Sequence, residues 1–136
     1  MCSWVGPMSM VWYNIVMPSR NLIKEYAEES YYHIYNRGVD KQVVFKQQED
    51  FVVFLGLLKR YLGSELQKNS NRIDHPNYFN EVELLAFCLM PNHFHLFIYQ
   101  ADNKDAITRF MRSIITAYSM YFNKKYKRVG PLFQQR

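Results

Sequence analysis

The sequence predicts an α+β fold in which an antiparallel sheet carries helices packed on one face. Two observations lead to this prediction. Strand-type and helix-type hydrophobic patterns follow one another in the order strand, helix, strand, strand, helix. The chain also has 136 residues, of which 49% are hydrophobic and 17% aromatic, and this is enough for one domain with a hydrophobic core.

The first predicted strand is residues 30–37, which are rich in aromatic and β-branched side chains. Gly38 is expected to end this strand and to allow a tight turn. Arg37 then lies at the strand end, where a guanidinium group can bind a phosphate, although an ordinary surface arginine fits the position equally well. Alternate side chains of the strand share one face, and these are Tyr31, His33, Tyr35 and Arg37.

Residues 48–62 carry apolar side chains at helical spacing and predict a helix that packs on the core. Acidic residues lie in its first turn and basic residues in its last, which suits the helix dipole. Gly63 is expected to stop this helix. The polar residues 64–80 then predict an exposed loop, in which His75 has no partner nearby in sequence.

Residues 83–90 and 93–100 predict the two strands of an antiparallel hairpin, joined by a Pro-Asn turn. Residues 104–126 predict a long amphipathic helix, and residues 129–134 begin a new extended segment. This order resembles the beginning of a ferredoxin-like or RRM-like sandwich, which normally has a further strand. The fold is therefore expected to be incomplete at the C-terminus.

The second strand of the hairpin contains His93-Phe94-His95. Because strand side chains alternate, both histidines point to one face, about 6–7 Å apart along the strand. Two imidazoles placed in this way can occupy adjacent positions on one divalent metal ion. On this pattern alone, packed or hydrogen-bonded histidines are the more common interpretation. The side chains predicted to point into the core are Phe94, Leu96 and Ile98.

The net charge of +5 is concentrated in the last part of the chain. From Ala101 onward, eight lysine and arginine residues are balanced by only two aspartates. A basic field at one end favours a polyanionic partner, most simply nucleic acid, and a solvated helix face is the alternative.

Two cysteines, Cys2 and Cys88, lack the spacing of a zinc site or a disulfide framework, which favours a reducing cytosol. Cys88 lies in an apolar run and is predicted to be a small core residue. Residues 1–16 carry no charge, lack the basic start of a signal peptide and are too short to span a membrane. They are interpreted as a leader outside a main domain of residues 17–136, with a short strand or a partner-binding tail as the alternative.

Three segments carry a family resemblance: Tyr32–Gly38, Met90–Leu96, and Tyr121–Tyr126 with Gly130–Gln134 behind it. In this order they resemble the REP-associated branch of the single-tyrosine HUH transposases, where HUH denotes His, a bulky hydrophobic residue and His. The resemblance covers about residues 17–136. It implies transposition of a mobile element, with metal-assisted cleavage and rejoining of DNA strands through a phosphotyrosine intermediate.

The resemblance also implies that His93 and His95 hold Mg²⁺ or Mn²⁺. It implies a single-stranded or hairpin DNA partner rather than a membrane, and a cytoplasmic protein associated with the nucleoid. Related transposases include dimers and monomers, so a homodimer stays open. The residues predicted to bind DNA are Arg37, Asn92, Arg109, Arg112, Lys124, Lys125 and Arg128.

The family nucleophile is a tyrosine on a later helix, in a Tyr-Ile-x-x-Asn-Pro-like segment whose Asn or Gln completes the metal site. No such segment precedes Arg136, and Tyr118 and Tyr121 match the packing helix instead. The chain is therefore expected to be C-terminally truncated, a fragment or a decayed copy, with strand cleavage absent or weak. The alternatives are an RRM-like nucleic-acid-binding module without cleavage activity and a small metal-dependent phosphodiesterase.

Overall fold

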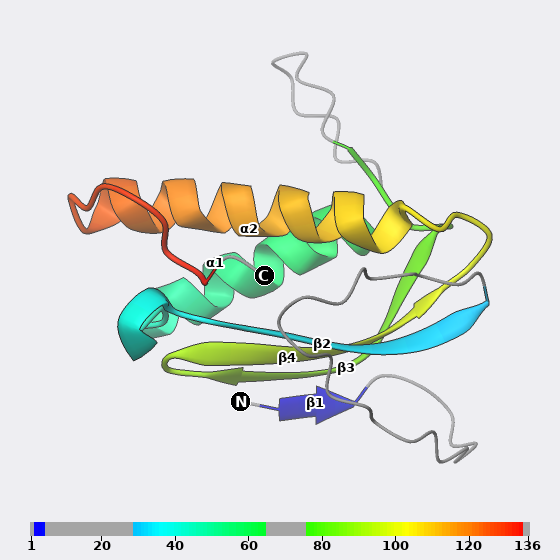
Figure 1. Cartoon of the computed structure of the whole chain (residues 1–136), viewed down its shortest axis with the longest axis horizontal. Coiled ribbons are helices and arrows are strands. Elements are labelled where there is room, and N and C mark those ends of the chain that lie inside the picture. Colours follow the sequence, from blue (N-terminus) through cyan, green and yellow to red (C-terminus); the bar gives the residue numbers. More distant parts are fainter. Residues whose placement is uncertain (1, 5–28, 65–75, 135–136) are drawn as a thin grey trace.

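The computed structural model describes residues 2–4, 29–64 and 76–134 (Figure 1). The expectations for His75 and for the start of the main domain at residue 17 lie outside these residues, as does most of the predicted leader. The elements in chain order are β1 (Cys2–Trp4), β2 (Ser30–Arg37), a 3-10 turn η1 (Val39–Lys41), α1 (Gln48–Leu62), β3 (Val82–Met90), β4 (His93–Gln100) and α2 (Ala106–Lys125).

The described strands form one antiparallel sheet in the order β1-β3-β4-β2. The predicted hairpin is confirmed, because β3 and β4 pair across the turn at Pro91 and Asn92. The strand predicted at residues 30–37 is confirmed to the residue, and it pairs with β4 along its whole length. β4 therefore lies in the middle of the sheet, with a long strand on either side.

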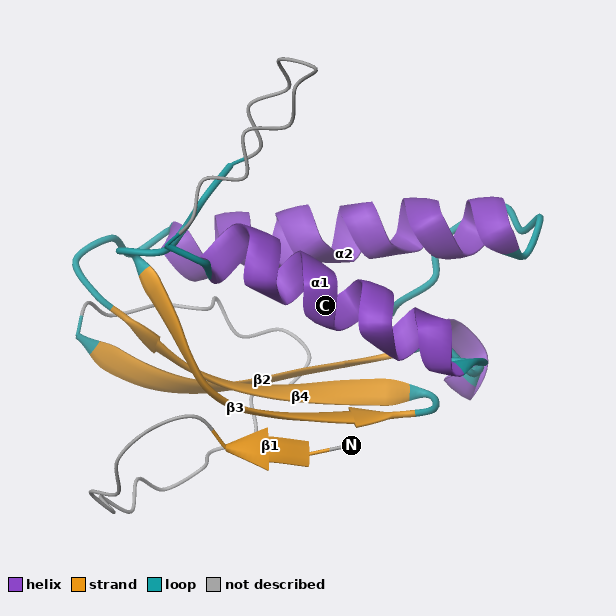
Figure 2. Cartoon of the chain, turned by 180° about the vertical axis from the view of Figure 1, so that it is seen from behind, coloured by secondary structure: helices purple, strands orange, loops and turns teal. Residues whose placement is uncertain are grey.

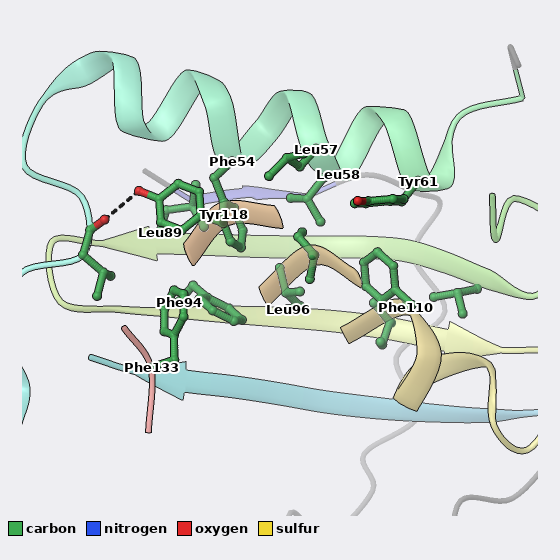
Figure 3. Packing of buried hydrophobic residues seen from close by; sticks show 14 of the residues in the cluster. Phe54, Leu57, Leu58, Tyr61, Leu89, Phe94, Leu96, Phe110, Tyr118 and Phe133 are labelled. Atoms are coloured by element: carbon green, nitrogen blue, oxygen red, sulfur yellow. Dashed lines mark hydrogen bonds between the residues drawn. The ribbon is translucent and has the colours of Figure 1, made fainter. Parts of the chain in front are cut away.

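Both helices cover the same face of this sheet, and no helix of the described residues lies on the other face, which we call the open face (Figures 1 and 2). On the covered face, Phe94, Leu96 and Ile98 of β4 are completely buried, as predicted. Figure 3 shows Phe54 of α1, Tyr118 of α2 and Phe94 of β4 between the layers, and the ring centroid of Phe54 is 5.1 Å from each of the other two. The α+β fold with helices packed on one face is thus confirmed.

The helices are joined by a buried polar contact near the first turn of α1 and the last turn of α2. Asp50 is fully buried, and its carboxylate accepts hydrogen bonds from Lys125 Nζ (2.8 Å), Tyr121 Oη (2.9 Å) and Tyr126 Oη (2.7 Å). It also accepts the backbone N–H of Gln47, which caps the start of α1. Burial alone would raise the pKa of Asp50, but these hydrogen bonds lower it to about 2.

Gly38 ends β2 as predicted, but for a different reason from the one expected. Its φ of −58° is open to any residue, so a special turn conformation is not what requires glycine. A Cβ at Gly38 would lie 2.4 Å from the carbonyl oxygen of Gln42 and 2.9 Å from Val44. Glycine is needed because the chain folds closely back on itself. Beside it, Phe133 pairs with Gly38, and the Gln134 N–H donates to the Arg37 carbonyl oxygen.

The prediction about the cysteines is wrong. Cys2 and Cys88 form a disulfide, and Cys88 is partly exposed on the open face rather than in the core. The cause is β1, which pairs with β3 so that Cys2 stands directly opposite Cys88. The two cysteines are 86 positions apart, which hides this relation in the sequence. The alternative reading of part of the leader as a short strand is confirmed for residues 2–4.

Candidate functional site

β4 places His93 and His95 on the open face of the sheet, because the alternate residues fill the core on the other face. The register of β2 completes this surface, since Arg37 stands opposite His93 and Tyr35 stands opposite His95. The ring centroids of His93 and His95 are 5.1 Å apart, and both side chains are partly exposed. The predicted common face of the two histidines is therefore confirmed.

A hydrogen bond fixes the orientation of the His93 ring. Its Nδ1 lies 2.7 Å from Oδ1 of Asn92, and an amide oxygen can only accept. The amide of Asn92 is oriented by its Nδ2, which donates to the Lys41 carbonyl oxygen at 3.4 Å. His93 must therefore carry its proton on Nδ1, which leaves the Nε2 lone pair available for a metal ion.

A third histidine, His33 of β2, orients the His95 ring. Its Nε2 lies 2.8 Å from Nδ1 of His95, and the two rings stack at 5.0 Å with planes 6° apart. When His95 donates from Nδ1, its Nε2 is left as a lone pair, as in His93. Burial lowers the pKa of His95, and the neighbouring His33 and His93 lower it further, so neutral imidazole is favoured.

Sequence reasoning assigned His33 to the correct face of its strand but did not connect it with His95. The two residues are 62 positions apart, and they meet only because β2 and β4 pair in one particular register. The signal in the sequence was a histidine on the same strand face as Arg37. What was missing was the register, which alternation within a single strand cannot supply.

The residues predicted to bind DNA separate into two groups. Arg37 and Asn92 lie beside the histidines, and the Nε atom of Arg37 is buried without a hydrogen-bond partner among the described residues. The second group consists of the cations of α2 and Arg128, which follows that helix. Because α2 lies on the covered side of the sheet, the structure does not bring its cations to the histidines.

Most of that second group is engaged in other contacts. Arg109 forms an ion pair with Glu81, and Lys125 forms one with the buried Asp50. Arg128 donates to the side chain of Asn123 and to the carbonyl oxygen of Pro131. Arg112 and Lys124 are exposed, and no hydrogen bond or ion pair involves either of them within the described part of the chain.

The tyrosines of α2 do not reach the histidines. Tyr118 is fully buried, its hydroxyl donates to the Val44 carbonyl oxygen at 2.6 Å, and burial raises its pKa strongly. Tyr121 donates to Asp50, and burial raises its pKa as well. Neither hydroxyl is placed to attack a phosphate on the open face, which agrees with the match of these residues to a packing helix.

Two further properties of the described residues concern groups of metal ligands and membrane-spanning helices. Within residues 2–4, 29–64 and 76–134, no group of three or more His, Cys, Asp or Glu side chains is arranged to hold a metal ion. Neither helix in the same ranges has the length and apolar character needed to cross a lipid bilayer.

Comparison with known proteins identifies the family. The family model described as "Transposase IS200 like" matches residues 68–135, which is half of the chain and includes β3, β4 and α2. No curated protein and no solved structure matches. The matched half contains both histidines of β4, whose side chains share the open face of the sheet. The chain therefore belongs to the IS200-like transposase family.

Proposed function

We propose that this transposase-family protein binds single-stranded or hairpin DNA on the open face of its sheet, where His93 and His95 present a divalent cation to a DNA phosphate. One observation carries the proposal. Each histidine has Nδ1 engaged by a neighbour, Asn92 for one and His33 for the other, and a ring that donates from Nδ1 keeps its Nε2 lone pair for a ligand. The residues matching the transposase family include this pair.

The donor set suits Mg²⁺ or Mn²⁺ only as part of a larger site. Both ions prefer oxygen ligands, and two imidazoles leave coordination positions for water and for phosphate oxygens of the DNA. When bound there, such an ion polarises the phosphate and stabilises negative charge on the leaving oxygen. The contribution of the chain is to hold both rings in the correct tautomer, through Asn92 and His33.

Arg37 is the residue placed to hold the DNA backbone beside this pair. It stands opposite His93 in the sheet and is partly exposed. A guanidinium group can pair with a phosphate through two hydrogen bonds. The cations of the helix layer, Arg109, Arg112, Lys124, Lys125 and Arg128, contribute a general attraction for DNA rather than contacts at the reacting phosphate.

In full, the proposal places DNA binding on a domain of residues 17–136 in a cytoplasmic, nucleoid-associated protein, with cleavage and rejoining through a phosphotyrosine as the activity of the family. A second candidate is an RRM-like DNA-binding module without cleavage. It is favoured by the tyrosines of α2, because Tyr118 is buried and Tyr121 is bonded to Asp50 on the covered side of the sheet. The two candidates share the DNA-binding face and differ only in the nucleophile.

The test measures binding of a fluorescent single-stranded hairpin oligonucleotide with and without Mn²⁺, for the wild type and for His93→Ala with His95→Ala. We expect binding that weakens steeply with salt and that Mn²⁺ strengthens in the wild type only. Val52→Ala is the matched control, because Val52 is 59% exposed on α1, in the helix layer. Absent or salt-insensitive binding would overturn the DNA assignment, and an Mn²⁺ effect that survives the double substitution would overturn the metal assignment.

The same mixtures separate the two candidates when they are run on a denaturing gel. A covalent protein–DNA adduct that requires Mn²⁺ supports cleavage through a phosphotyrosine, and peptide mapping identifies the tyrosine. Salt-dependent binding without any adduct supports the binding module.

A further inference from the structure

A group of aromatic side chains lies on the open face next to the histidines. We call Tyr31, Phe97 and Tyr99 the aromatic platform. Tyr31 is 55% exposed and Phe97 is 40% exposed. The ring centroids of Tyr31 and Phe97 are 6.1 Å apart with planes 19° from parallel, and Tyr31 and Tyr99 are 5.0 Å apart. These rings share the face opposite the core, so the packing of the helices does not explain them.

The platform continues directly from the histidine site. Along β4, His95 and Phe97 are two residues apart, about 6.6 Å on the same face. Across the sheet, His33 stands opposite Phe97, while Tyr35 stacks on His95 with ring centroids 5.7 Å apart. A DNA strand whose phosphate lies at the histidines therefore meets exposed aromatic rings within a short distance.

The charges around the platform indicate which part of a nucleotide it accepts. Glu83 stands opposite Tyr99 in the sheet, and burial together with the negative charges of Glu29, Asp102 and Glu83 raises the pKa of Tyr99, so carboxylates lie near this end of the face. Arg37 lies at the opposite end, beside His93. Phosphates are thus attracted to the histidine end and repelled from the Tyr99 end, and attraction at the platform must come from uncharged bases.

We propose that the aromatic platform is a stacking site for unpaired bases of the DNA strand whose phosphate lies at His93 and His95. The inference rests on the proposed function and adds a base-binding subsite to it. Flat aromatic side chains stack on every base, so this subsite accepts single strands with little sequence preference. Paired bases in a duplex hide their faces and are excluded.

The experiment measures the affinity of a short single-stranded oligonucleotide by fluorescence anisotropy in EDTA, so that no divalent metal contributes. Tyr31→Ala and Phe97→Ala should each weaken binding about tenfold, within the range of about 5- to 150-fold that stacking on one base provides. Tyr31→Phe should keep wild-type affinity, since it retains the ring. Met120→Ala is the control on the helix layer, where Met120 is 69% exposed.

A second oligonucleotide of equal length and charge, with abasic sites in place of the bases, separates stacking from attraction to phosphate. The wild type should bind it at least about tenfold more weakly, and the combined variant Tyr31→Ala with Phe97→Ala should no longer distinguish the two strands. Equal affinities of wild type and both alanine variants for the normal strand would overturn the platform and leave the proposed function intact. A wild type that binds no single strand at all would overturn both.

Discussion

The two faces of the sheet differ in what holds their side chains in place. On the covered face, Phe94 is completely buried and its ring contacts Phe54 and Phe133, with centroids 5.1 and 5.5 Å away. On the open face, His93 and His95 are only partly covered, and single hydrogen bonds to Asn92 and His33 orient their rings. Neighbouring residues of one strand thus belong to two different environments.

This difference separates stability from function along β4. Many contacts fix each side chain of the covered face, so a change there affects folding. A few polar contacts fix each side chain of the open face, so a change there affects binding and leaves the core intact. The following substitutions test that separation, beginning with the largest expected effect.

Phe94→Ala should lower the free energy of unfolding by about 3–5 kcal/mol, because it removes a buried ring and leaves a cavity between the helices and the sheet. Urea denaturation measures the loss. Phe97→Ala is the matched control, since it makes the same chemical change three residues further along the strand, on the open face. It should cost less than about 1 kcal/mol. Equal losses in the two variants would contradict the contrast between the faces.

Asp50→Asn should lower the free energy of unfolding by about 2–3 kcal/mol, because it leaves Lys125 without its buried partner. The loss stays below that of a fully buried pair, since 26% of the Lys125 side chain remains exposed to water. Glu49→Gln is the control, because Glu49 is exposed and lies 3.5 Å from the same Lys125 nitrogen. It should cost less than about 1 kcal/mol.

The same pair gives the expected pH dependence. The pKa of Asp50 is about 2 in the folded protein against 3.8 as the reference value, so its contribution is complete above pH 3.8 and is lost as pH falls through 2. The wild type should therefore lose about 2 kcal/mol of stability across this window that Asp50→Asn does not lose. Parallel pH profiles for the two proteins would show that the carboxylate carries no such contribution.

Gly38→Ala should lower the free energy of unfolding by about 1–3 kcal/mol, because its Cβ would meet the carbonyl oxygen of Gln42. Gly38 also donates its N–H to the carbonyl oxygen of Asn92, so the support of His93 should weaken together with stability. Gly56→Ala is the control with the opposite sign. It lies within α1 with open space around it and should stabilise by up to about 1 kcal/mol. Destabilisation by both substitutions would point to a general effect of alanine rather than a clash at Gly38.

Hydrophobic periodicity predicted the elements well, because each pattern depends on residues close in sequence. β2, α1 and β4 have the predicted bounds, while β3 begins one residue earlier. α2 begins at Ala106 rather than at residue 104, since Gln100 accepts the N–H of Ile107 and the side chain of Asn103 accepts that of Asp105. The His-x-His pattern likewise gave the face shared by its two histidines.

What periodicity missed depends on contacts between distant segments. Asp50 was expected only to suit the helix dipole, but it is buried because the end of α2 brings three donors to it. The pairing of Cys2 with Cys88 needs the position of β1, and the contact of His33 with His95 needs the register of β2. Alternation tells which face a residue occupies, but not which residue faces it across the sheet.

His33→Ala should have the smallest effect on stability and a clear effect on the site. Its side chain is exposed, so the free energy of unfolding should change by less than about 1 kcal/mol. Affinity for Mn²⁺ should fall about tenfold, because nothing would then hold the proton of His95 on Nδ1. His33→Gln should recover most of this affinity, since its amide oxygen can still accept that proton.

A tautomer measurement separates this positioning role from a structural one. The ¹⁵N chemical shifts of the metal-free wild type should show His95 protonated on Nδ1, and His33→Ala should convert this signal to a mixture of both tautomers. His93 serves as the internal control, because Asn92 holds its tautomer independently of His33. Weaker Mn²⁺ binding with an unchanged His95 tautomer would mean that His33 acts on the metal site by another route. An unchanged affinity would remove His33 from the metal site altogether.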